Sequence, residues 1–259
     1  MSETPIKKQY IDRDLIVYEK TVGAVAPTVA SFPSFIDDRV RLRFAEFGIL
    51  DFFSHQVEAL NAIYDRRDVV IATGTSSGKS LCYQIPILDQ MLRDRSACAL
   101  LIFPTKALTQ DQFLSLRKLL PEYAGEIAVF DGDTPANQRT VIKERARVIL
   151  TNPDMLHFGL LPFHPGWARF FTNLKIVVVD EAHVYRGIFG AHTANVFRRL
   201  NRVCAYYARI SEPHQYILAS ATLGNAAMLA EKLTGRCCAA VENDSSGSGN
   251  RDFIFVNPP

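Results

Sequence analysis

From about residue 52 onward, short apolar runs alternate with longer stretches of helical spacing. The runs are apolar throughout, which is typical of strands buried on both faces of a parallel sheet. In chain order they read "DVVIA", "CALLIF", "IAVF", "RVILT", "LKIVVVD" and "YILAS". Helical spacing between them predicts helices over 79–93, 106–120, 135–145, 189–209 and 225–234. This alternation predicts an α/β fold with a mostly parallel central sheet flanked by helices.

The two ends of the chain lack this alternation. The stretch "APTVASFPSF" predicts that residues 1–45 form an extended arm over the surface of the domain. The stretch "ENDSSGSGNRD" predicts a flexible linker, and only "FIFVNPP" follows it. We therefore expect an N-terminal arm (1–45), one α/β domain (46–241) and a linker (242–259).

Composition limits the possible classes of protein. The chain has 259 residues, of which 48% are hydrophobic, so it can bury a full core. Its formal charge of +2 means that any surface for nucleic acid must be local. No apolar run reaches the length of a membrane helix, and the N-terminus lacks a secretory signal, so we expect a cytoplasmic protein with no membrane partner. The five cysteines contain no C-x-x-C pair and are expected to be buried, reduced thiols.

The stretch "ATGTSSGKS" (72–80), which we call the GKS loop, directly follows the first apolar run. It ends as a phosphate-binding loop does, but Thr73 stands where G-x-x-x-x-G-K-[ST] has its first glycine. At the carboxyl end of a parallel strand, turn amides and a helix N-terminus favour an anion. Lys79 would then reach the phosphates of a nucleotide, and the Ser80 hydroxyl would bind Mg²⁺. Taken alone, the stretch could instead be a polar loop that caps a helix.

The stretch "IVVVDEAH" (176–183) adds a second motif about a hundred residues later. Its apolar run brings Asp180 to the carboxyl end of a strand, where an aspartate can hold Mg²⁺. Glu181 would polarise the attacking water. An acidic helix N-terminus after a strand is the alternative for this stretch. Two independent motifs in the right order predict a nucleotide site.

Several motifs together resemble a known family. The "GKS" loop, "DEAH" and "SAT" (220–222) resemble the first motor domain of a superfamily 2 helicase, a RecA-like P-loop domain. "FFSHQ" resembles the Q-motif, "FPTKAL" motif Ia, "FDGDT" motif Ib, and "TNPDML" the motif that follows. "ATGTSSGKSLCYQIPIL" and "DEAHVYRGIFGAHTANVFRRL" look like the YprA/MrfA-type bacterial DNA repair helicases, relatives of the yeast and archaeal Hrq-type enzymes. "FGILDFFSHQ" also matches the spacing of the RecQ nucleotide motif, but has Phe53 where RecQ proteins usually carry a basic residue.

The resemblance implies a role for each matching residue. ATP and Mg²⁺ are the implied cofactors, with Ser80 and Asp180 on the metal. The implied catalytic residues are Lys79, Asp180, Glu181 and His183. Gln56 would read adenine, with Phe53 as a stacking partner, and the phosphates would lie on Thr75, Ser76, Ser77, Gly78, Lys79 and Ser80. The implied contacts to the DNA backbone are Thr105, Lys106, Gly132, Asp133, Thr151 and Asn152. Coupling between the two sites would involve Ser220, Ala221 and Thr222.

The resemblance also implies an activity and partners. ATP hydrolysis would drive unwinding of DNA, bound as a single strand or a 3′-tailed duplex. The second motor domain and the zinc-binding tail of the family are not found after the linker, so we expect the isolated chain to be nearly inactive. A superfamily 2 translocase that moves on duplex DNA without unwinding it stays an alternative. So does a non-catalytic, ATP-switched binding module, although the intact Lys79, Asp180 and Glu181 argue against it.

Two further clusters have a structural and a functional interpretation. Arg198, Arg199 and Arg202 could form a basic stripe for phosphates, but a solvated helix face is the preferred interpretation. Trp167, Phe170 and Phe171 could stack on bases, but their near-helical spacing favours a place in the core.

Overall fold

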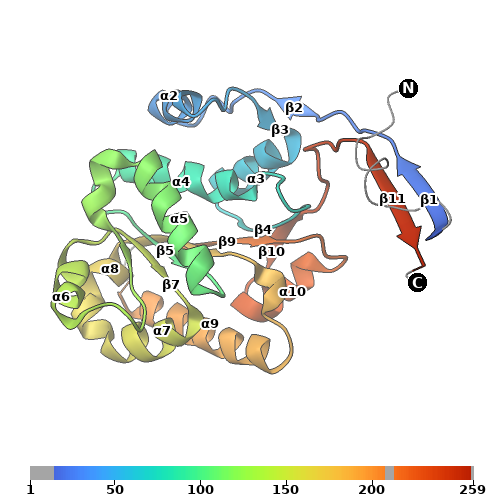
Figure 1. The fold of residues 1–259 in the computed structure, drawn as a ribbon. Helices are drawn as coiled ribbons and strands as arrows, with labels where there is room; N and C mark the ends of the chain where they lie inside the picture. The colour runs from blue at the N-terminus through green and yellow to red at the C-terminus, as the bar shows by residue number, and fades with distance from the viewer. Residues whose placement is uncertain (1–14, 208–212, 258–259) are drawn as a thin grey trace.

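The computed structural model describes residues 15–207 and 213–257. Its centre is a seven-stranded sheet in the order β10-β4-β9-β8-β5-β7-β6, in which every pairing is parallel (Figure 1). Its strands are β4 (Asp68–Ala72), β5 (Cys98–Ile102), β6 (Ile127–Val129), β7 (Val148–Thr151), β8 (Leu174–Val179), β9 (Gln215–Ser220) and β10 (Cys238–Val241). The expected α/β class with a parallel central sheet is therefore confirmed.

The apolar runs of the sequence form the strands because both faces of the sheet are covered. In β4, Val69 and Ile71 pack into one buried cluster, while Val70 and Ala72 pack into the other. Successive side chains of a strand point to opposite faces, so a doubly covered strand must be apolar at every position. The sixth predicted run is β9, and only the edge strand β10 was not predicted in this sheet. Its sequence "CAAV" is short and mostly half-buried, which leaves little pattern to detect.

Helices cover both faces of the sheet (Figure 1). The main helices are α2 (Asp38–Glu46), α3 (Ser54–Tyr64), α4 (Lys79–Arg93), α5 (Lys106–Leu119), α6 (Ala136–Arg145), α7 (Pro153–Met155), α8 (Ala168–Thr172), α9 (Gly187–Tyr207) and α10 (Ala226–Thr234). Helices α3, α4 and α5 lie on one face, and α8, α9 and α10 on the other. The five predicted helices are confirmed to within one or two residues at each end, except that residues 208 and 209 lie outside the described part.

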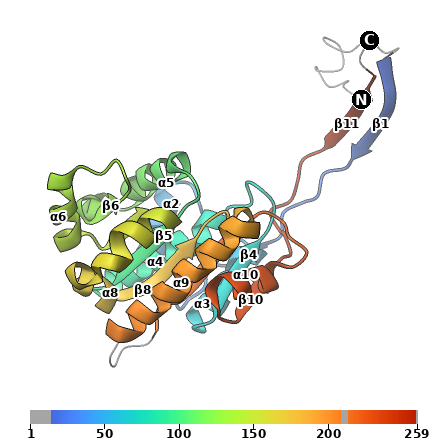
Figure 2. The same cartoon turned by 90° about the horizontal axis from the view of Figure 1, so that it is seen from below.

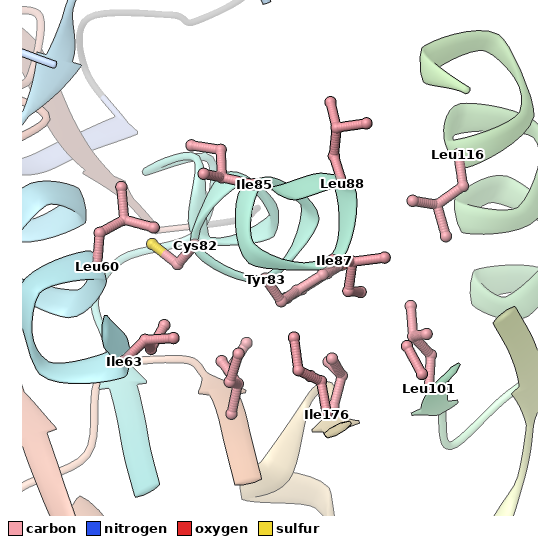
Figure 3. Close-up of a cluster of buried hydrophobic side chains, with 14 of the residues drawn as sticks. Leu60, Ile63, Cys82, Tyr83, Ile85, Ile87, Leu88, Leu101, Leu116 and Ile176 are labelled. Atoms are coloured by element: carbon pink, nitrogen blue, oxygen red, sulfur yellow. The ribbon is translucent and has the colours of Figure 1, made fainter. Parts of the chain in front are cut away.

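Helix α4 sits at the centre of one of these faces, between α3 and α5 (Figure 3). Cys82, Ile85, Ile87 and Leu88 are all buried in its packing. Burying an isoleucine or leucine side chain stabilises the fold by about 1.5–3 kcal/mol. Lys79 and Ser80, the last two residues of the GKS loop, are also the first two residues of α4, so this packing holds the end of the loop in place.

The ends of the chain pair with each other, which the sequence did not predict. Strand β1 (Ile16–Val22) and strand β11 (Arg251–Val256) form an antiparallel ribbon that projects from the sheet domain (Figure 2). Strand β2 (Val29–Ala30) pairs with β3 (Phe52–Phe53). The N-terminal segment therefore lies against the domain at β2 and α2 but leaves it at β1. The Gly- and Ser-rich stretch was expected to be flexible, yet Ser248 and Val25 exchange two backbone hydrogen bonds of 2.9 Å.

Three further observations concern the cysteines, the metal-ligating side chains and the lengths of the apolar helices. Cys82, Cys98 and Cys204 are buried and Cys238 is half-buried, but Cys237 is exposed, so the expectation of buried thiols is wrong for that residue. Within residues 15–207 and 213–257, no group of three or more metal-ligating side chains comes together. No helix in this described part is long and apolar enough to cross a lipid bilayer.

Candidate functional site

The GKS loop connects β4 to α4 at the carboxyl edge of the sheet. Gly78 adopts a left-handed backbone with a φ of 76°, and a Cβ there would lie 2.4 Å from Gln56 Nε2. Both conformation and space therefore require glycine at this position. The hydroxyls of Thr73 and Ser77 are fully buried and lie 2.7 Å apart. This hydrogen bond closes the loop where the usual motif has its first glycine.

Lys79 is the first residue of α4, and its ammonium group lies against the GKS loop. Nζ donates to the carbonyl of Thr73 at 3.1 Å and to that of Gly74 at 2.5 Å. The amino end of α4 adds the positive end of the helix dipole. Ser80, which is partly buried, follows in the first turn. A cation, a hydroxyl and helix N–H groups thus come together, and this donor set fits the phosphates of a nucleotide.

Gln56 packs directly on the GKS loop. Its Nε2 donates to the carbonyls of Ser77 at 3.3 Å and Gly78 at 3.1 Å, while its Oε1 accepts from the Phe53 amide at 2.9 Å. The Phe53 ring stacks on His55 with centroids 5.8 Å apart. The structure therefore places Gln56 and Phe53 beside the loop, and their contact with adenine stays a prediction.

Asp180 follows β8 at the same edge of the sheet. Its amide donates to the Ile102 carbonyl at 3.0 Å, and its carboxylate accepts from the Glu181 amide at 2.8 Å and the Tyr83 hydroxyl at 3.2 Å. Burial raises the pKa of Asp180, and these two hydrogen bonds oppose the rise. Tyr83 lies one turn after Lys79 on α4, so it links Asp180 to the helix that begins at the GKS loop.

Glu181 and His183 connect the end of β8 to the end of β9. Glu181 has a left-handed backbone with a φ of 49°, a conformation that costs a non-glycine residue about 1–3 kcal/mol. Nδ1 of His183 lies 3.2 Å from Glu181 Oε2 and 3.3 Å from the Ala221 amide nitrogen. An amide can only donate, so the Ala221 contact requires Nδ1 to be unprotonated, whereas pairing with Glu181 requires it to be protonated. Nδ1 of His183 can therefore make only one of these two contacts at a time, and the presence or absence of a proton on Nδ1 decides which one.

Ser220 ends β9, which lies between β4 and β8 in the sheet. Its hydroxyl is buried and has no hydrogen-bond partner among the described residues. Buried polar atoms are nearly always paired, so this hydroxyl is available to a group bound at this edge of the sheet. The neighbouring Thr222 is exposed.

The six residues implied as DNA contacts lie at the ends of three other strands, β5, β7 and β6. Strands β5, β7 and β6 lie together on one side of the sheet. The residues are Thr105 and Lys106 after β5, Gly132 and Asp133 after β6, and Thr151 and Asn152 at the end of β7. The structure therefore gathers them along one edge, and their contact with DNA stays a prediction.

These six residues differ in how free their side chains are. Lys106 Nζ and Asp133 Oδ2 form an exposed ion pair of 2.5 Å, which raises the pKa of Lys106. Thr105 and Asn152 cap the amino ends of α5 and α7. Thr151 is buried, and its hydroxyl donates to the Phe130 carbonyl at 2.7 Å. Of the six side chains, that of Thr151 is the one most fully occupied by contacts within the fold.

Two contacts of the site were missed by sequence reasoning. Tyr83 was assigned only to a helix, although its spacing of four residues from Lys79 puts both on one helix face. His55 is buried, and its Nε2 lies 3.1 Å from the Ser77 carbonyl. It precedes Gln56 in the chain, but no pattern in the sequence marks it as a neighbour of the loop.

The two uncertain clusters are largely structural. Trp167, Phe170 and Phe171 are each at most 2% exposed, so their expected place in the core is confirmed. Arg198 and Arg202 are exposed on α9, as expected for a solvated helix face. Arg199 is half-buried and contacts His157 instead.

Comparisons with known proteins agree with this arrangement. The DEAD/DEAH box helicase family matches residues 53–229. The chain is 42% identical to the ATP-dependent helicase YprA of Bacillus subtilis over 229 residues, which cover 88% of this chain and 30% of YprA. It is 42% identical to the ATP-dependent helicase HRQ1 of Saccharomyces cerevisiae, over 81% of this chain and 20% of HRQ1.

Solved structures give the same result. The helicase MrfA bound to DNA and AMPPNP superimposes with a TM-score of 0.89 at 38% identity, over 95% of this chain and 34% of MrfA. The DEAD-box helicase Mss116 shares the fold, with a TM-score of 0.67 at 18% identity. The chain thus spans about a third or less of YprA, HRQ1 and MrfA. It belongs to the DEAD/DEAH box helicase family.

Proposed function

We propose that this chain is the ATP-binding motor domain of an ATP-dependent DNA helicase. The proposal rests on one observation, which is that helix α4 links the GKS loop to the end of β8. Lys79 lies on the loop carbonyls, and Tyr83, one turn later on α4, donates to Asp180. A cation for phosphate and a carboxylate for a metal ion are thereby held by one helix. The helicase relatives are much longer than this chain, so the activity of the whole protein is itself part of what we propose.

Each residue at this edge has a distinct part in hydrolysis. Lys79 would leave the loop carbonyls and donate to the β- and γ-phosphates of ATP. Mg²⁺, which neutralises charge on the triphosphate, would be held by Ser80 and Asp180. Glu181 would polarise the water that attacks the γ-phosphate. His183 would transmit the state of this site to the SAT segment through the Ala221 amide.

The base of the nucleotide would be read beside the loop. Gln56 would turn its amide to the adenine edge, and Phe53, whose ring is only partly buried, would stack on the base. Both residues already lie within contact of the GKS loop or its neighbours. We therefore assign Gln56 to the preference for ATP over GTP, and not to phosphate affinity.

DNA would lie along the ends of β5, β7 and β6. The relative MrfA has been solved bound to DNA, which supports this assignment. Lys106 supplies a cation there, and Thr105, Gly132 and Asn152 supply small polar or backbone groups suited to phosphate oxygens. A second motor domain of the same polypeptide would close over ATP, and an arginine from it can be worth about 10³–10⁵ in rate. We therefore expect the chain alone to hydrolyse ATP only near background.

Titration with fluorescent ATP and GTP tests the nucleotide site. Lys79→Ala removes a charge-assisted contact worth about 1.5–3 kcal/mol, which corresponds to an affinity roughly 10- to 150-fold weaker. Gln56→Ala should reduce the preference for ATP over GTP more than it reduces affinity. Lys118→Ala, at an exposed position in the last turn of α5, is the matched control. Unchanged ATP affinity in Lys79→Ala would contradict the site.

A further inference from the structure

The segment that leaves the sheet after β10 returns along the GKS loop. Oδ2 of Asp244 accepts from the Gly74 amide at 2.8 Å. Oδ1 of Asp244 is held by the amide and hydroxyl of Ser246, at 2.9 and 2.6 Å. The Ser245 hydroxyl lies 2.9 Å from the His55 amide and 2.8 Å from His55 Nδ1. We call residues 244–248 the exit clasp.

The exit clasp reaches the loop a second time, through His55. The Ser245 amide lies 3.3 Å from Nδ1 of His55 and can only donate, so Nδ1 is an acceptor. The ring proton is then on Nε2, which donates to the Ser77 carbonyl at 3.1 Å. Burial lowers the pKa of His55 and keeps the ring neutral, in agreement with this tautomer. The clasp thus holds the loop near its start, at Gly74, and near its end, at Ser77.

The other side of the exit clasp is bound to the N-terminal segment. The Thr28 amide donates to the Ser245 carbonyl at 2.9 Å, and Ser248 pairs with Val25. Gly247 has a φ of 74°, and a Cβ there would lie 2.6 Å from the Val25 carbonyl oxygen. The clasp therefore joins the loop to both segments that continue into the β1–β11 ribbon.

Asp244 binds the loop at a residue that precedes those assigned to the phosphates. It takes the amide of Gly74, whereas the residues assigned to the phosphates begin at Thr75. Burial alone would raise the pKa of Asp244, but hydrogen bonds from Ser246 and the Gly74 amide outweigh it and hold the pKa below its usual range. The carboxylate is therefore ionised at neutral pH. A hydrogen bond from an amide to a carboxylate is roughly twice as strong as a neutral one.

Resting on the proposed function, we propose that the exit clasp is a positioning element for the nucleotide site. Asp244 and Ser245 hold the GKS loop in the shape that accepts phosphates. Coupling between two sites is reciprocal, so a bound nucleotide must tighten the clasp as much as the clasp improves nucleotide binding. Nucleotide binding would thereby stiffen the segment that leads out of the domain.

The first test is nucleotide affinity of the chain 1–259, measured by titration with fluorescent ATP and Mg²⁺. Asp244→Ala should weaken binding roughly fivefold to tenfold. Ser245→Ala should weaken it about twofold to threefold, because the Gly74 contact remains. Asn250→Ala is the matched control, since within the described residues the hydrogen bond of the Asn250 side chain is the one that it accepts from the Ala24 amide in the N-terminal segment. Its affinity should equal that of the wild type.

The second test is hydrogen exchange of the clasp amides. If the clasp had only a structural role, their exchange rates would not change when nucleotide binds. In the wild type, the amides of Ser246 and Ser248 should exchange more slowly when the Mg²⁺ complex of AMPPNP is added. Ser245→Ala is a mild change that leaves the fold intact. In this variant, the slowing of exchange caused by the nucleotide should decrease by the same factor as the nucleotide affinity. Protection that does not change with nucleotide in the wild type overturns the inference.

Lys79→Ala, measured in parallel, separates this inference from the proposed function. If Lys79→Ala binds as the wild type does, the nucleotide site itself is wrongly assigned. If Lys79→Ala weakens binding but Asp244→Ala and Ser245→Ala do not, only the exit clasp is rejected. An equal loss in Asn250→Ala and Asp244→Ala also rejects it, because the effect would then come from loosening the N-terminal segment.

Discussion

The ends of β4, β9 and β8 and the ends of β5, β7 and β6 share one edge of the sheet but differ in how their polar groups are held. At the first group of ends, Thr73 and Ser77 are fully buried and hydrogen-bonded to each other, and Asp180 accepts a hydrogen bond from Tyr83. At the second group, Lys106 and Asp133 are exposed and pair only across the surface. We call these two groups the nucleotide half and the strand half of the edge.

This difference in burial indicates which kind of chemistry suits each half. Charges in a buried, low-dielectric site interact strongly and must be fixed in place, which suits the transfer of a phosphoryl group. Exposed charges are screened by salt within about 8–10 Å, which suits contacts that are made and released along a strand. Substitutions of the buried groups in the nucleotide half should therefore have large effects, and substitutions of the exposed charges in the strand half small, salt-dependent ones.

The largest effect is expected for Glu181→Gln. The amide cannot polarise water as a carboxylate does, so turnover should fall by about 10²–10⁴ in a polypeptide that also carries the second motor domain. ATP binding should persist, because among the described residues Glu181 is bonded to Asp180 and His183 and has no hydrogen bond to the loop. Steady-state ATPase rates and an ATP titration measure the two quantities. Hydrolysis at the wild-type rate would show that Glu181 is not the base.

A smaller effect is expected for Asp180→Ala. Removing a metal ligand should abolish the gain in nucleotide affinity that Mg²⁺ provides, with a loss of about tenfold or more. Affinity measured in EDTA should be nearly unchanged, which distinguishes this loss from that of Lys79→Ala. Titrations with and without Mg²⁺ make the comparison. Equal losses in both conditions would contradict a metal role for Asp180.

The effect of pH gives a third prediction, for Tyr83→Phe. The raised pKa of Asp180 means that its carboxyl is protonated at a higher pH than an ordinary aspartate, and Mg²⁺ requires the ionised form. Mg²⁺-dependent affinity should therefore fall as the pH falls through this raised pKa. The Tyr83 hydrogen bond lowers that pKa, so the phenylalanine variant should lose affinity at a higher pH than the wild type does.

Tyr185→Phe is the matched control for this shift. The Tyr185 hydroxyl is buried and has no hydrogen-bond partner in the described part of the chain, so its removal takes no bond from Asp180. Its pH profile should overlay that of the wild type. A profile of Tyr83→Phe that does the same would mean that the 3.2 Å contact does not reach the titration of Asp180.

The two halves also differ in how far the sequence predicts them. Buried strands such as β4 and β8 are continuous apolar runs, so their ends, and with them Lys79 and Asp180, follow from the pattern. The contacts of Tyr83 and Asp244 depend on tertiary packing between segments that are 97 and 170 residues apart, and no local pattern records them. For the same reason the β1–β11 ribbon was missed, since its partners lie at opposite ends of the chain.

The smallest effects are expected for Lys106 and Asp133 in the strand half. Lys106→Ala should weaken binding of a single-stranded oligonucleotide only severalfold and reduce the slope of log affinity against log salt by about one. The resemblance implies a DNA contact for Asp133, but its carboxylate pairs with Lys106 and repels phosphates. Asp133→Asn should therefore tighten binding, by less than about fivefold, because it releases Lys106 and removes a negative charge. Lys118→Ala controls for the loss of a lysine elsewhere on α5. Fluorescence anisotropy at several salt concentrations measures both changes. If Asp133→Asn weakens binding as much as Lys106→Ala does, Asp133 itself contacts the strand, and the ion pair is part of the DNA site and does not compete with it.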